Sequence, residues 1–293
     1  MNLNSVVLVP AGNTASLKEV LSWGSDALCL DLQGLVHPGK RTQVRASVKD
    51  DLNNLDGDQS LLLARINLEE METDLKAVVW PKLGGVVVPG VEDPEVVKRL
   101  DRDIAALERE RNIPAGNVRI IPFLDSGKGL WFAQSIATAS PRVAAIVLGM
   151  GDLLFDLLRT SEDYPYFTGP VPRFPVPDYI WSRLAFISSV SKVQLLGLLG
   201  TTVIPGRARS QDLNKAAGLA RQAGFHGAFV LDQSGVEACR QGFSVPEAVR
   251  RMAQDILDKQ AQGQPVTNGQ LHLAGVLLEP AAVSKKGLGG SKL

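Results

Sequence analysis

Two aspartates and one arginine stand at the ends of short apolar runs in this sequence of 293 residues. Asp125 follows "RIIPFL", Asp152 follows "IVLGMG", and Arg65 closes "LLLAR". Neighbouring carboxylates repel each other, and a hard cation such as Mg²⁺ offsets that repulsion while it also binds water and substrate oxygens. An arginine can hold a carboxylate through two parallel hydrogen bonds. The residue types therefore predict a site where Asp125 and Asp152 bind Mg²⁺ and Arg65 binds an organic acid.

Each aspartate also has a purely structural interpretation. An aspartate just before a helix accepts hydrogen bonds from the first free backbone N–H groups of that helix. The segments "DSGKGL" (125–130) and "GDLLFDL" (151–157) both allow this role. The coincidence of two aspartates and an arginine at predicted strand ends favours a site over two separate helix caps.

The elements that must position these residues are eight short apolar runs, each bounded by Gly, Pro, Asn or Asp. They are nearly continuous in Val, Ile and Leu, which is typical of strands buried on both faces of a parallel sheet. The predicted strands cover residues 5–10, 27–32, 61–67, 84–90, 119–125, 144–152, 194–200 and 226–233. Segments with helical spacing separate several of them, for example 14–24, 94–111 and 211–224. The alternation predicts an α/β fold, a (β/α)8 TIM barrel, with a doubly wound open sheet as the alternative.

The domain organisation follows from this pattern. We expect the barrel over residues 1–236, a C-terminal helical extension over 237–282, and a disordered Gly/Lys/Ser-rich tail over 283–293. Residues 160–178 contain five prolines and predict a long loop after the sixth strand, either a lid over the site or a surface insertion. In a barrel of this kind the C-terminal ends of the strands meet at one mouth, so the polar residues found there converge.

Composition excludes several classes of function. Lys and Arg number 31, as do Asp and Glu, so nothing favours a nucleic acid or an anionic membrane as partner. There is no zinc-binding histidine motif, and the two cysteines are far apart in sequence, which argues against a disulfide framework. The N-terminus does not resemble a signal peptide, and no apolar run approaches the roughly 18 residues of a membrane span. We expect a cytoplasmic protein that binds a small molecule.

The order and spacing of several motifs resemble the HpcH/HpaI aldolase family, in its branch that is similar to the citrate lyase beta subunit. The resemblance covers roughly residues 5–250. The segments that carry it are "SVVLVPAGN", "SDALCLDLQGLVHPGKRTQVR", "ARIN", "IPFLDSGKGL", "VLGMGDLLFDL" and "AGFHGAFVLDQ". The resemblance implies a Mg²⁺-dependent barrel that cleaves or forms a carbon–carbon bond in acyl-CoA thioesters or 2-keto acids, and a homotrimer or hexamer.

Carried over by position, the resemblance makes Asp125 and Asp152 the metal ligands. Arg65 becomes the catalytic residue that holds the keto acid or its enolate. Asn67, Gly149 and Gly151 join Arg65 as substrate-binding residues, because glycines beside a metal ligand let substrate and backbone meet.

The sequence departs from the family pattern at several positions. Gln33 and Gly34 replace an acidic pair, Gly90 replaces a lysine after Pro89, and Ala228 replaces a second lysine. Three hypotheses therefore stay open. The chain is a lyase or aldolase with an altered substrate, a non-catalytic relative that serves as a binding or assembly partner, or a thioesterase that uses the same metal site.

Overall fold

The computed structural model describes residues 3–12, 14–55, 60–158, 175–199, 210–245 and 247–278. Most of the long loop expected over 160–178, and the tail expected over 283–293, lie outside these residues. The last part of that expected loop is helical, because a helix begins at Pro175. Proline is well accommodated in the first turn of a helix, where its missing N–H would have no intrahelical partner.

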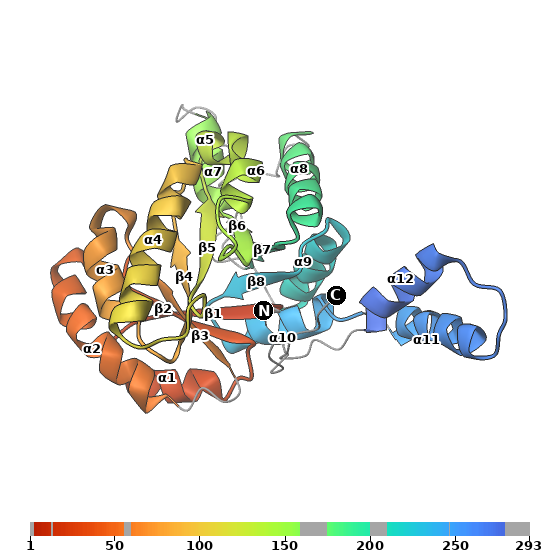
Figure 1. The fold of residues 1–293 in the computed structure, drawn as a ribbon, viewed down its shortest axis with the longest axis horizontal. Helices are drawn as coiled ribbons and strands as arrows, with labels where there is room; N and C mark the ends of the chain where they lie inside the picture. The colour runs from red at the N-terminus through yellow and green to blue at the C-terminus, as the bar shows by residue number, and fades with distance from the viewer. Residues whose placement is uncertain are drawn as a thin grey trace. The chain divides into compact units, whose positions relative to one another are not determined.

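Eight parallel strands close into a barrel in chain order, with the first strand paired to the eighth (Figure 1). This closure confirms the predicted (β/α)8 fold and excludes the open sheet. The strands are β1 (Ser5–Pro10), β2 (Ala27–Asp31), β3 (Leu61–Arg65), β4 (Leu83–Val88), β5 (Arg119–Leu124), β6 (Ala145–Leu148), β7 (Gln194–Leu198) and β8 (Gly227–Val230). The sixth strand ends earlier than expected, and Met150 already belongs to the next helix.

Helices follow the strands and surround the barrel (Figure 1). They are α1 (Thr14–Leu21), η1 (Pro38–Lys40), α2 (Arg41–Asn54), η2 (Leu68–Glu70), α3 (Met71–Val78), α4 (Pro94–Glu110), α5 (Gly127–Trp131), α6 (Ala133–Ala137), α7 (Met150–Leu158), α8 (Pro175–Ser191), α9 (Ser210–Gln222) and α10 (Gln233–Gly242). Helix α4 illustrates how the sequence specifies these helices. Its N-cap Asp93 accepts a hydrogen bond from the N–H of Glu95 at 2.8 Å, and its buried residues recur every three or four positions.

Two apolar clusters fill the barrel unit. The larger one lies between the sheet and the surrounding helices, and the smaller one fills the barrel interior. The interior cluster takes alternate residues of the strands, such as Ile121 and Phe123 of β5. Successive side chains of a strand point to opposite faces, so the next inward position of β5 is residue 125. The interior core thus supports the floor of the mouth.

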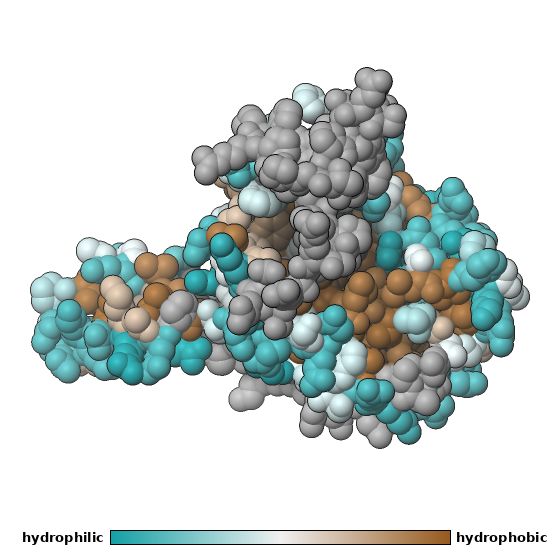
Figure 2. Space-filling view, turned by 180° about the vertical axis from the view of Figure 1, so that it is seen from behind, coloured by the Kyte–Doolittle hydropathy of each residue, from teal (hydrophilic) through white to brown (hydrophobic). Residues whose placement is uncertain are grey.

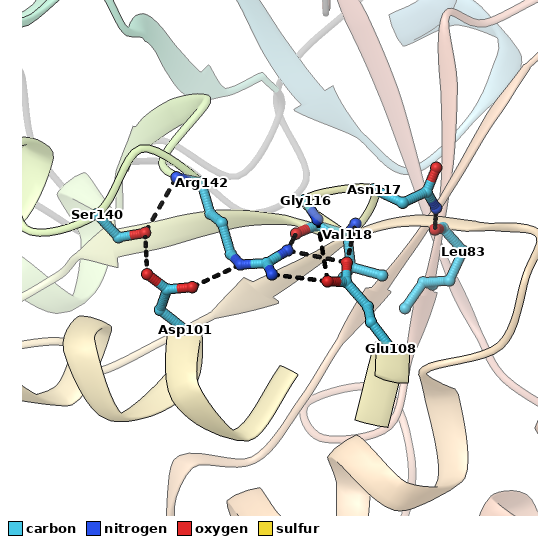
Figure 3. Close-up of polar contacts among 8 residues, drawn as sticks. All are labelled: Leu83, Asp101, Glu108, Gly116, Asn117, Val118, Ser140 and Arg142. Atoms are coloured by element: carbon cyan, nitrogen blue, oxygen red, sulfur yellow. Dashed lines mark hydrogen bonds and ion pairs between the residues drawn. The ribbon is translucent and has the colours of Figure 1, made fainter. Parts of the chain in front are cut away.

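A buried ion-pair network ties α4 to the turns that precede β5 and β6 (Figure 3). Arg142 donates two hydrogen bonds to the carboxylate of Glu108, at 2.8 and 2.6 Å, and a third to Asp101 at 2.6 Å. Glu108 also accepts the backbone N–H groups of Gly116 and Val118. The network lies where these strands begin, at the end opposite the mouth, and its role is therefore stability.

The compact barrel unit runs from Leu3 to Phe243, and a second unit begins at Ser244. The boundary expected after residue 236 falls within α10, which packs against α9 and belongs to the barrel. The second unit contains α11 (Glu247–Ala261) and α12 (Asn268–Leu278), which pack against each other. Their surface carries apolar side chains among polar ones, including exposed Met252 and Leu273 (Figure 2). Among the described residues, no helix is long and apolar enough to cross a membrane.

Candidate functional site

The mouth of the barrel brings together the last inward-facing residues of neighbouring strands. Asp31 and Arg65 are register partners on β2 and β3, each two residues beyond an interior core residue of its strand. Asp125 follows β5 in the same way, two residues beyond Phe123. The period of two along each strand therefore directs one arginine and two aspartates to the same end of the barrel interior.

Arg65 lies over the interior core with part of its guanidinium unused. Its side chain is 19% exposed, its Nη1 lies 3.6 Å from Asp31 Oδ2, and its Cζ lies 5.6 Å from the centre of the Phe123 ring. Its Nε is buried and has no hydrogen-bond partner within the described part of the chain. An unpaired buried donor on a cation is costly, and an anionic ligand would satisfy it.

Asp31 is a site residue that was not among the candidates. It is fully buried, and its carboxylate accepts the backbone N–H groups of Gln33, Gly34 and Leu35 at 2.9, 3.2 and 2.7 Å. It thus shapes the turn after β2 and places a negative charge beside Arg65. Its position at the end of an apolar run was visible in the sequence, but its pairing with Arg65 was not.

Asp125 is half-buried and close to two other charged residues of the site. Burial raises the pKa of its carboxyl above the ordinary value, and the negative charge of Asp152 adds to this rise. A hydrogen bond from the N–H of Gly90 to Oδ2, at 3.0 Å, and the positive charge of Arg65 oppose it. Arg65 and Asp152 therefore both lie within electrostatic reach of Asp125.

Neither aspartate has the simple capping role that the sequence allowed. The N-cap of α5 is Ser126, whose hydroxyl accepts the N–H of Gly129 at 3.1 Å, so Asp125 is not the cap. Asp152 is exposed in the first turn of α7, where the positive end of the helix dipole favours a negative charge. Asp152 is thus accessible to solvent, and its charge acts on Asp125.

Asn67 has a structural role beyond the end of β3. Its side chain accepts the N–H of Glu69 at 3.1 Å as the N-cap of η2, and its own N–H donates to Asp74 at 2.7 Å. Asp74 is in turn held by an ion pair with Arg45 of α2, at 2.6 Å. These contacts anchor the segment that follows Arg65.

The two glycines of "GMG" have different surroundings. A Cβ at position 149 would lie 2.8 Å from the Cβ of Asp125, so Gly149 lets the segments after β5 and β6 approach closely. A Cβ at position 151 would meet nothing within 4 Å. The space beside Gly149 is thus taken by Asp125, whereas the space beside Gly151 is open.

Two carboxylates at the mouth fit the requirements of a magnesium ion. Mg²⁺ is commonly held by one or two carboxylates and completes its coordination with water and substrate oxygens. Asp125 and Asp152 supply that number, and the negative charge of Asp152 adds to the rise that burial causes in the pKa of Asp125. No group of three or more His, Cys, Asp or Glu that could hold a metal occurs among the described residues. The donor set suits Mg²⁺ better than a metal that needs a complete protein cage.

Sequence comparisons show which known proteins this chain is similar to. The citrate lyase subunit beta of Leuconostoc mesenteroides subsp. cremoris is 22% identical over 282 residues, which cover 95% of this chain and 89% of that protein. An L-malyl-CoA/beta-methylmalyl-CoA lyase of Cereibacter sphaeroides (strain ATCC 17029 / ATH 2.4.9) is 27% identical over 152 residues, or 49% of this chain and 46% of that protein.

The fold also matches a solved structure, that of the protein CitE from Mycobacterium tuberculosis in complex with magnesium, acetoacetate and coenzyme A. The TM-score is 0.68 at 18% identity, and the match covers 96% of this chain and 98% of that one. This likeness shows the barrel fold. The family model for HpcH/HpaI aldolase/citrate lyase matches residues 4–232, so the chain belongs to that family.

Proposed function

We propose that this protein is a Mg²⁺-dependent carbon–carbon lyase or aldolase that acts on an acyl-CoA thioester or a 2-keto acid. The feature that supports the proposal is the set Arg65, Asp125 and Asp152: Arg65 and Asp125 continue the inward-facing positions of β3 and β5, and the charge of Asp152 acts on Asp125. The relatives reported above are named lyases, one of them an L-malyl-CoA/beta-methylmalyl-CoA lyase. The solved relative was determined with magnesium, a keto acid and coenzyme A, which fits the proposed donor set.

In this proposal Asp125 and Asp152 hold the metal ion. When bound there, Mg²⁺ would supply a Lewis acid that polarises a carbonyl oxygen. Arg65 binds the carboxylate of the keto acid through its unused N–H groups, and Asp31 keeps the guanidinium in place. Asn67 and Gly151 border the substrate on the side of β3 and β6, and Gly149 leaves room for Asp125 beside it.

A role as an assembly or binding partner is the second candidate. The specific observation in its favour is the neutral turn after β2, where Gln33 and Gly34 stand at the mouth. Such a turn provides no general base, and none of the residues assigned above has that role. In either case we expect a homotrimer or hexamer, which light scattering of the purified chain would test.

The deciding experiment combines metal binding and turnover. Calorimetry should show Mg²⁺ uptake that glyoxylate strengthens and that the Asp152→Ala variant lacks. The wild-type chain should then cleave malyl-CoA or citramalyl-CoA only with Mg²⁺ present. Metal binding without turnover on either thioester would favour the assembly partner. Release of free coenzyme A without a matching aldehyde or keto acid would identify a thioesterase instead.

A further inference from the structure

The carboxylate of Asp125 is held by a residue from the neighbouring strand. Gly90 follows β4, and its backbone N–H donates to Asp125 Oδ2 at 3.0 Å. This is a long-range contact, because 35 positions separate the two residues in sequence. It joins the loop after β4 to the loop after β5, at the edge of the mouth.

The backbone conformation at Gly90 is what directs this N–H towards Asp125. Its φ is +70°, in the left-handed region that residues with a Cβ adopt at a cost. Space does not demand a glycine here, since the nearest atom to a Cβ at this position would be Leu68 Cδ2 at 4.0 Å. The requirement for glycine at position 90 is therefore one of backbone conformation and not of packing.

Asp125 is confined on its other side as well. Gly149 donates its N–H to the carbonyl of Leu124 at 3.1 Å, which holds the segments after β5 and β6 together. A Cβ at position 149 would lie 2.8 Å from Asp125 Cβ, so little room remains for Asp125 to shift in that direction. The position of its Cβ is thus limited by packing, and the rotation of its carboxylate is limited by the hydrogen bond from Gly90.

We propose that Gly90 is a positioning residue for the metal site: its left-handed backbone points an N–H at Asp125 and holds the carboxylate in the orientation that binds the cation. This inference rests on the proposed function, in which Asp125 is a ligand. Hydrogen bonds to a ligating carboxylate orient it, and the loss of such a partner typically weakens metal binding by roughly 10–100-fold. The hydrogen bond to Asp125 comes from the backbone of Gly90, so the residue type at position 90 does not reveal it in the sequence.

The first test compares variants with equal backbone strain. Gly90→Ala should weaken Mg²⁺ binding by roughly 10-fold in calorimetry with glyoxylate present. Gly24→Ala is the matched control, because Gly24 has φ +72° and lies before β2, at the opposite end of the barrel. Gly90→Asn should restore most of the affinity, since asparagine adopts positive φ more readily than alanine. Equal Mg²⁺ affinities for Gly90→Ala and Gly24→Ala would overturn the proposal.

A second test does not involve the metal. In the metal-free protein, the Gly90 amide should exchange its hydrogen with solvent several-fold more slowly in the wild type than in Asp125→Ala. Asp125→Asn keeps an acceptor oxygen and should retain the protection. An unchanged exchange rate in Asp125→Ala would overturn the proposal, whatever the metal results. Protection of the amide together with no Mg²⁺ uptake by the wild type would leave the contact in place and reject the proposed function.

Discussion

Arg65 and Asp31 are register partners on adjacent strands, and their nearest charged atoms lie 3.6 Å apart at the mouth of the barrel. This distance is longer than that of a good hydrogen bond. Asp31 therefore attracts the guanidinium group of Arg65 but does not occupy its N–H donors. Asp31 itself also accepts three backbone N–H groups of the next turn. The pair therefore leaves the buried Nε of Arg65 without a hydrogen-bond partner among the described residues.

Replacing Arg65 by lysine should impair substrate binding while the fold remains intact. Lysine keeps the positive charge but lacks the planar pair of donors that matches a carboxylate. A lost hydrogen bond to a charged group costs about 1.5–3 kcal/mol, so kcat/KM should fall by roughly 10–100-fold. Steady-state kinetics checks this, and circular dichroism serves as the control for folding. A wild-type kcat/KM in Arg65→Lys would show that Arg65 does not bind the substrate through two parallel hydrogen bonds.

The pH dependence of metal binding should reflect Asp125. Burial and the charge of Asp152 raise its pKa, so the carboxyl takes up a proton at a higher pH than an ordinary aspartate. Mg²⁺ requires the ionised form, and its affinity should therefore start to fall above the usual aspartate range of about 4 as the pH is lowered. Calorimetric titrations at a series of pH values would measure this. An affinity that falls only below that range would contradict the raised pKa.

The same shift predicts an effect on the stability of the metal-free protein. The folded protein binds the proton of Asp125 more tightly than the unfolded chain does, so this group's contribution to stability is greatest when it is protonated. That contribution is lost as the pH rises through the unfolded and then the folded pKa. Asp125→Asn should accordingly raise the Tm of the metal-free protein at neutral pH, and it should abolish the gain in Tm that Mg²⁺ gives the wild type. A lower Tm in Asp125→Asn would reject this assignment.

Gly149→Ala should disturb the metal site through packing. The added Cβ would lie 2.8 Å from Asp125 Cβ, so Asp125 must move or the segments after β5 and β6 must separate. Overpacking of this kind costs about 1–3 kcal/mol of stability, and we expect a loss of Mg²⁺ affinity beside it. Gly218→Ala on α9 is the control, because a Cβ there meets nothing within 4 Å. Thermal melts and calorimetry of both variants would distinguish a local clash from a general effect of alanine.

The ion pair between Arg142 and Glu108 should dominate stability at the other end of the barrel. The two side chains are only 8% and 1% exposed, and removal of one partner leaves a buried charge without compensation. Arg142→Met should therefore lower the free energy of unfolding by about 3–5 kcal/mol, measured by denaturant titration. The exposed pair Arg251–Glu247 of α11 offers the contrast, since Arg251→Ala should change stability little. Similar losses in both variants would argue against the special role of burial.

The barrel could be predicted because the same sequence pattern, a short apolar run, occurs at each strand. Continuous apolar runs mark strands buried on both faces, and all eight of them form strands in the structure. Strand ends were less certain, because a run such as 144–152 continues into a helix that is also apolar. The spacing of residues does not show where one element ends when its neighbour is buried too. Pro175 did not indicate the start of α8 either, because proline is common both in loops and in the first turn of a helix.

From the sequence, the site could be predicted only where the chemistry comes from the side chains. Arg65 ends β3, Asp125 follows β5, and Asp152 lies in the first turn of α7; all three were singled out by residue type and by their position after an apolar run. The contribution of Gly90 comes from a backbone N–H, and the role of Asp31 depends on Arg65, its partner on the adjacent strand. Such contacts are set by register and by backbone angles, which one sequence does not reveal. The glycine at position 149 was singled out for closeness to substrate, whereas the structure shows close packing against Asp125.

The pairing of β1 with β8 has a consequence for how this protein can join with others. A closed ring of strands leaves no free edge of hydrogen-bonding groups, so another chain cannot extend the barrel sheet by adding a strand of its own. Any assembly with a second copy or a related subunit must be built from helices and loops outside the barrel. Side-chain complementarity on those outer elements, and not backbone pairing, would then decide which subunits recognise each other.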